Sequence, residues 1–100
     1  MAQFPVHDLI DDVEFNLVVV IQSDFFDFID TRVVIPVREH QSARLDELIN
    51  PALDWRGRSL TLLTERIATI PKARLGRQRG DFKTHSLEIS RAIDRLMTGF

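Results

Sequence analysis

Residues that commonly carry out catalysis are few in this sequence, and they are scattered. The three histidines, His7, His40 and His85, fall in separate segments, and no two of them have the spacing of metal ligands. The chain has no cysteine, which removes disulfides, thiolate zinc sites and cysteine nucleophiles together. It also has no nucleophile elbow, phosphate-binding loop or dinucleotide-binding glycine motif. The sequence therefore predicts a protein that is not an enzyme, with no metal site and no cofactor.

Charged residues are divided unevenly between the two halves of the chain, although the net charge is only −2. Residues 1–50 carry ten acidic residues against three arginines, whereas residues 51–100 carry ten basic residues against five acidic ones. The bases of segment 72–83 do not alternate with aromatic residues, as a stacking platform for nucleic acid requires. We therefore expect no direct nucleic-acid binding, and we interpret these bases as a solvated loop or as a surface for an acidic protein.

Three aromatic residues occupy a short acidic segment, 24–30. Phe25, Phe26 and Phe28 cannot all point into the one small core that 100 residues can build. They either cover the edge of that core or form a contact surface for another protein, because exposed apolar patches usually mark interaction sites. Together with the lack of catalytic motifs, this content favours a protein that works by binding a protein partner.

The elements that position these residues are mostly strands. Segments 16–22 and 31–38 are rich in β-branched residues, and Pro36 places the second of them at an edge or a bulge. Segment 52–64 is typical of a hairpin that turns at residues 56–58, and 67–70 predicts a further short strand. Segment 42–49 is equally compatible with a short helical turn and an irregular edge, and 72–83 is expected to be a loop.

The last segment predicts an amphipathic helix. Apolar residues recur at helical spacing in positions 89, 92, 93, 96, 97 and 100. Thr84 or Ser86 is placed to cap its start, and Gly99 is placed to end it. Several strands followed by one helix indicate a β-dominated α+β fold, and we expect one domain over residues 1–100.

Targeting signals are not evident in the chain. Its longest apolar run, Leu17 to Ile21, is far shorter than the roughly 18 residues of a membrane span. The first residues show no basic region followed by an apolar one, as a signal peptide would. We therefore expect a cytoplasmic protein that does not associate with a membrane.

Six short elements, in order over nearly the whole chain, resemble the CcdB family of toxins. They are Gln22-Ser23-Asp24, Val34-Ile35-Pro36-Val37, Leu63-Thr64, Ala68-Thr69-Ile70-Pro71, Leu75-Gly76 and the closing segment Ile89 to Phe100. The resemblance implies an SH3-like barrel of antiparallel strands with a C-terminal α-helix, assembled as a homodimer. We expect the dimer interface to include the helix and the sheet beneath it.

The resemblance also implies a function. A toxin of this family binds the A subunit of DNA gyrase and traps the enzyme on cleaved DNA, and an antitoxin removes it. We expect the cognate antitoxin to have a disordered acidic tail, because the second half of this chain is basic. Carried over position by position, the gyrase-binding residues are Phe25, Phe26, Asp94, Met97, Thr98, Gly99 and Phe100.

One of these positions departs from the pattern of the plasmid toxin of the family. Thr98 stands where that toxin has a tryptophan, which stacks on arginine side chains of gyrase. Two alternatives therefore stay open beside a gyrase inhibitor. The chain is a relative with the same fold whose gyrase activity is lost or altered, or it is a ribonuclease toxin built on the same barrel.

Overall fold

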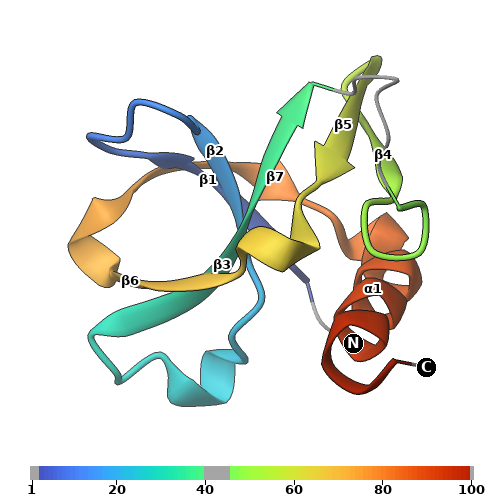
Figure 1. The fold of residues 1–100 in the computed structure, drawn as a ribbon. Helices are drawn as coiled ribbons and strands as arrows, with labels where there is room; N and C mark the ends of the chain where they lie inside the picture. Colours follow the sequence, from blue (N-terminus) through green and yellow to red (C-terminus); the bar gives the residue numbers. More distant parts are fainter. Residues whose placement is uncertain (1–2, 40–45, 100) are drawn as a thin grey trace.

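The computed structural model describes residues 3–39 and 46–99, and in these segments the strands form one curled antiparallel sheet (Figure 1). Six strands follow the order β4-β5-β3-β2-β1-β7, and β6 pairs with the free side of β3. The strands are β1 (Pro5–Leu9), β2 (Leu17–Val20), β3 (Thr31–Glu39), β4 (Ala52–Trp55), β5 (Arg58–Leu62), β6 (Ala68–Pro71) and β7 (Leu75–Asp81). One helix, α1 (Ser86–Thr98), packs beside this half-barrel. The predicted β-dominated fold with a C-terminal helix is confirmed.

The sheet is buried on both faces at its centre, which explains the unbroken apolar run of β2. Successive side chains of a strand point to opposite faces. Val19 joins the main core, where it packs with the helix residues Ile89 and Ala92. Val18 and Val20 join a second cluster on the other face, and this cluster is closed by apolar residues of β6 and β7. The core therefore needs both the curl of the sheet and the helix.

Pro36 lies in a central strand, so its predicted place at an edge or bulge is wrong. β3 pairs with β6 through Thr31–Val34 and with β5 through Val37–Glu39. The Pro36 carbonyl accepts a hydrogen bond from the Leu63 N–H at 3.0 Å, so its backbone faces the gap between these two partners. Proline has no N–H group. At position 36 that group would point into this gap, where no strand requires a hydrogen-bond donor.

Segment 72–83 is not a loop, as its glycines and bases had indicated. After a short 3₁₀ turn, η3 (Lys72–Arg74), the chain forms the strand β7, whose one strand partner within residues 3–39 and 46–99 is β1. An edge strand can keep polar side chains, and Arg77, Gln78 and Arg79 are exposed. Two register shifts interrupt the β1–β7 pairing. They disturb the alternation of buried and exposed side chains by which a strand is recognised in a sequence. The partner strand β1 was not predicted either.

The hairpin and the helix follow the predictions more closely. β4 and β5 are joined by Arg56 and Gly57, both at positive φ (50° and 79°), as a two-residue hairpin turn requires. Gly99 ends α1 in the left-handed conformation (φ 81°), and its N–H donates to the Arg95 carbonyl. The start of the helix differs from the prediction, because a 3₁₀ turn, η4 (Lys83–His85), leads into it without a side-chain cap from Thr84 or Ser86.

The structure describes only part of the segment for which a short turn was predicted. The predicted turn at 42–49 lies partly outside the described residues, and the remainder, 46–49, is a hydrogen-bonded turn closed by Asn50 rather than a helix. Among the described residues, no helix is long and apolar enough to cross a membrane.

Candidate functional site

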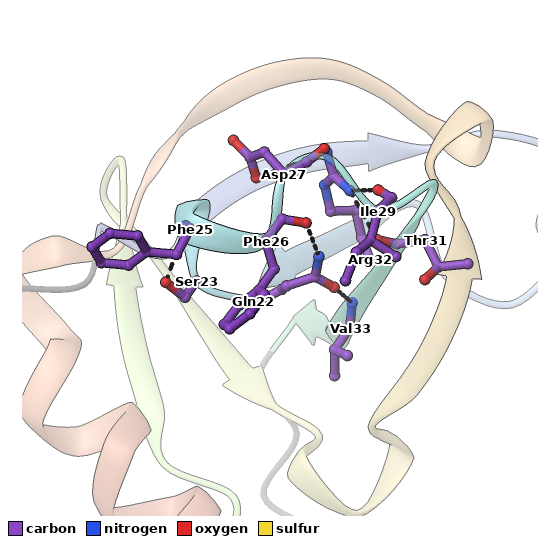
Figure 2. Close-up of polar contacts among 9 residues, drawn as sticks. All are labelled: Gln22, Ser23, Phe25, Phe26, Asp27, Ile29, Thr31, Arg32 and Val33. Atoms are coloured by element: carbon purple, nitrogen blue, oxygen red, sulfur yellow. Dashed lines mark hydrogen bonds and ion pairs between the residues drawn. The ribbon is translucent and has the colours of Figure 1, made fainter.

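The segment between β2 and β3 is held in a fixed conformation by side chains at both of its ends (Figure 2). The Gln22 amide donates to the Phe26 carbonyl and accepts from the Val33 N–H, both at 3.0 Å, so it ties the segment to β3. The Ser23 hydroxyl accepts a hydrogen bond from the Phe25 N–H and caps the 3₁₀ turn η1 (Asp24–Phe26). These bonds define the direction in which Phe25 and Phe26 project.

Arg32 holds the second half of the same segment. Only 7% of this residue is exposed, and its guanidinium donates to the carbonyls of Asp27, Ile29 and Thr31. The Asp27 carboxylate lies 3.7 Å from the guanidinium and balances its charge. A buried cation is tolerated only when its donors are satisfied, and here the acceptors are backbone atoms of the segment itself. The burial of Arg32 therefore depends on the conformation of residues 27–31.

This fixed backbone presents aromatic side chains to solvent. Phe25 is 89% exposed, Phe28 is 80% exposed and Phe26 is 50% exposed. The rings of Phe26 and Phe28 contact each other, with centroids 6.3 Å apart. For Phe25 and Phe28, the alternative that they cover the edge of the core is therefore wrong. Rigidly held, exposed aromatic residues are the usual anchors of protein–protein interfaces.

An open groove of about 950 Å³ separates this segment from α1. Phe25 borders it on one side and Ile93 and Asp94 border it on the other, with Phe4 and Val20 among the residues that line it between them. The fold thus places Phe25 and Asp94, which are far apart in the sequence, at the rim of the same groove. The groove is lined by apolar residues and by polar or charged ones, among them the carboxylates of Asp24, Asp27 and Asp94.

Of the remaining predicted residues, those that the structure describes do not line this groove. Phe26 faces Phe28, and Met97 is 60% exposed on α1. Thr98 is the last residue of α1, where its hydroxyl donates to the Asp94 carbonyl at 2.7 Å. Thr98 therefore belongs to the final helical turn, and Gly99 is the residue that ends the helix, as predicted. Phe100 lies outside the described residues.

The histidines have structural partners. The Nδ1 atom of His7 lies 3.0 Å from the Gly76 carbonyl, and that of His85 lies 2.8 Å from the Glu88 carboxylate. His40 lies outside the described residues. In the part of the chain that the structure describes, no group of three or more His, Cys, Asp or Glu side chains could hold a metal ion.

Comparison with known families completes the description of the site. The sequence model of the family described as "CcdB protein" matches residues 3–99. The chain belongs to the CcdB family. This family comprises toxins of toxin–antitoxin pairs, so an antitoxin partner is implied. No curated protein sequence matches the chain significantly.

A solved structure shows the same architecture as this CcdB-family chain. It is the Mycobacterium tuberculosis toxin MazF-mt6, with a TM-score of 0.67 over 91% of this chain and 93% of the other. At 19% sequence identity, the likeness establishes the barrel fold and nothing further.

Two supporting residues were not singled out as site residues from the sequence. Gln22 was quoted only as part of the Gln-Ser-Asp element, yet its side chain joins the turn η1 to β3. Arg32 precedes a run of β-branched residues, and no local pattern separates it from Arg38 of the same strand, which is exposed.

Proposed function

We propose that this chain is the toxin of a type II toxin–antitoxin pair, that it acts as a single domain, and that it inhibits DNA gyrase by binding the A subunit and trapping the cleavage complex. The observation that carries the proposal is the groove that Phe25 and Asp94 border together. These are two of the positions that the family resemblance assigns to gyrase binding, and they come from separate elements. Family membership supports the toxin part of the proposal.

The geometry favours inhibition by binding rather than by catalysis. Phe25 is exposed on a turn that Gln22, Ser23 and Arg32 hold in place. An anchor that is ordered before binding loses little conformational entropy when the complex forms. The partner would bury Phe25 and displace water from the groove.

A ribonuclease on the same barrel is the alternative reaction. RNA cleavage requires a general base and a general acid beside a cation that binds the phosphate. His7 and His85 are engaged by Gly76 and Glu88, respectively, which leaves both in structural contacts. The groove beside Phe25 supports gyrase binding, and these histidine contacts add no support for RNA cleavage.

The proposal also includes the assembly of the toxin. We propose a homodimer in the cytoplasm whose activity is neutralised by an antitoxin with a disordered acidic tail. In α1, two apolar residues remain exposed in the protomer: Met97 of the apolar stripe (60%) and Leu87 in the first turn (61%). Such residues support a further contact surface on the helix.

The test compares two phenylalanines of the same turn segment. Phe25→Ser should weaken binding to purified gyrase A subunit by about 2 kcal/mol, roughly thirtyfold, because an anchor residue at the groove is lost. Phe28→Ser is the matched control, since Phe28 is 80% exposed but does not line the groove. Calorimetric titration would measure both affinities, and thermal melting would show that both variants remain folded.

Equal affinity of Phe25→Ser and the parent for the A subunit would contradict the assignment of the groove. Equal losses in the two variants would place the contact on the outer side of the turn instead.

A further inference from the structure

The half-barrel is closed on its open side by side chains instead of a strand ladder. β4 and β7 are the two ends of the sheet order, and no pairing among the described residues joins them. Trp55 of β4 lies directly on Gly80 of β7, where an added Cβ would come within 2.7 Å of the indole ring. The Arg56 guanidinium donates to the Arg79 carbonyl across the same gap. This seam places the hairpin turn beside the edge strand.

A second hollow, of about 270 Å³, opens at this seam. It lies on the β1–β2 side of the seam and is distinct from the groove beside Phe25, with which it shares no residue. The residues that line it are mostly polar or charged: Asp8, Asn16, Leu17, Trp55, Arg56, Arg58 and Arg79. Three guanidinium groups against one carboxylate give it an excess positive charge.

The three arginines differ in how far their charge is balanced. The Arg79 Nε atom lies 3.0 Å from both carboxylate oxygens of Asp8, and Arg58 pairs with Glu39. Arg56 has no carboxylate partner among the described residues and stacks on Trp55, 4.8 Å from the ring centroid. Arg58 and Arg79 are about half exposed, with 56% and 42% of their side chains accessible. The hollow can therefore accept another anion without displacing a buried ion pair.

We propose that this seam hollow binds the carboxylate side chains of an acidic peptide segment on a protein partner. Guanidinium forks bind carboxylates with two parallel hydrogen bonds, and Arg56 and Arg58 flank the same turn. The site does not depend on gyrase binding, because it lies away from the Phe25 groove.

The surroundings of Trp55 favour a peptide over a nucleic acid. Single-stranded nucleic acids bind through bases that stack on free aromatic faces. The Trp55 ring is covered by the Arg56 guanidinium, by Gly80 and by Phe82, whose centroid is 5.2 Å away. A guanidinium thus lies over the ring, and Gly80 and Phe82 pack against it, so the hollow offers charge with little free aromatic surface.

The single tryptophan of the chain reports directly on this site. Titration with a hexaglutamate peptide at low salt should produce a saturable change in Trp55 fluorescence. Arg58→Gln should weaken the peptide about tenfold, since a hydrogen bond to a charged group is lost. Arg58 and its partner Glu39 are both largely exposed, so this variant should keep the parent's melting temperature.

Arg91→Gln is the matched control, because it removes the same charge from an exposed position of α1 outside the hollow. Its peptide affinity should stay within about twofold of the parent's if the binding is local and not due to net charge alone. Equal weakening by the Arg58 and Arg91 variants, or no fluorescence change at all, would overturn the proposal. Tighter binding of a hexauridylate RNA than of hexaglutamate would overturn it in favour of a nucleic-acid site.

Discussion

At the scale of single residues, Arg32 and Phe25 illustrate how one buried side chain fixes an exposed one. The buried Arg32 guanidinium donates hydrogen bonds to the carbonyls of residues 27, 29 and 31 instead of to water. These bonds hold residues 27–31, while Gln22 and Ser23 hold the preceding turn, in which Phe25 is exposed to solvent. The exposed Phe25 side chain takes no part in packing the core, so it is available to a partner.

Thr98 is the residue that departs most clearly from the plasmid toxin of the family. It is exposed at the last turn of α1, so Thr98→Trp can be accommodated without repacking the core. An aromatic face that stacks on an arginine of the partner is worth about 1–2 kcal/mol at a desolvated site. We therefore expect Thr98→Trp to bind the gyrase A subunit about tenfold more tightly, as measured by calorimetric titration.

A Thr98→Leu variant is the control for added apolar area without an aromatic face. If Leu and Trp strengthen binding equally, the gain comes from apolar contact alone. No gain from either would show that position 98 does not face gyrase in this protein.

At the scale of elements, the seam between β4 and β7 depends on the absence of a side chain at Gly80. That residue has φ 154°, a conformation that other residues rarely adopt, and the Trp55 ring occupies the space of a Cβ. Trp55 also packs edge-to-face on Phe82, a fully buried core residue. A displaced indole would therefore disturb both the seam and the core.

Gly80→Ala should lower the free energy of unfolding by about 2–3 kcal/mol through this steric conflict and the backbone strain. Gly57→Ala is the matched control, since Gly57 also has positive φ but nothing lies within 4 Å of its added Cβ. The control should lose about 1 kcal/mol from strain alone. Urea unfolding followed by Trp55 fluorescence would measure both, and equal losses would show that Trp55 does not fill the seam.

The elements that were predicted from the sequence are those with a strong local signal. The β-branched runs of β2 and β3, the hairpin at Arg56-Gly57 and the apolar period of α1 each depend on neighbouring residues. β1 and β7 were missed because they pair with each other from opposite ends of the chain, through a register interrupted by bulges. The meeting of Phe25 and Asp94 at one groove could be expected only from the family resemblance, since no local pattern relates two such distant positions.

At the scale of the whole molecule, several large apolar residues remain exposed in the protomer. Phe25 and Phe28 lie on the β2–β3 segment, and Leu87 and Met97 lie on α1. A toxin that binds gyrase and also forms a homodimer needs apolar surface for both contacts. The proposed dimer would account for the part of the α1 stripe that the core does not bury.

Sedimentation equilibrium at micromolar concentration tests the proposed dimer. The expected mass is twice the 11.6 kDa of one chain. Leu87→Glu and Met97→Glu together should shift the equilibrium toward the monomer, because each places a charge in an apolar interface. A parent protein that sediments as a monomer would contradict the dimer without affecting the assignment of the Phe25 groove.

The most direct test of the central claim is a DNA cleavage assay with purified gyrase, supercoiled plasmid and ATP. Phe28→Ser serves as the active control and Phe25→Ser as the inactive one. The proposed function predicts that the parent protein inhibits supercoiling and that linear DNA accumulates after denaturation of the trapped complex. With Phe25→Ser, the supercoiling activity and the amount of linear DNA should equal those of gyrase alone. Full supercoiling activity and no linear DNA in the presence of excess parent protein would contradict it.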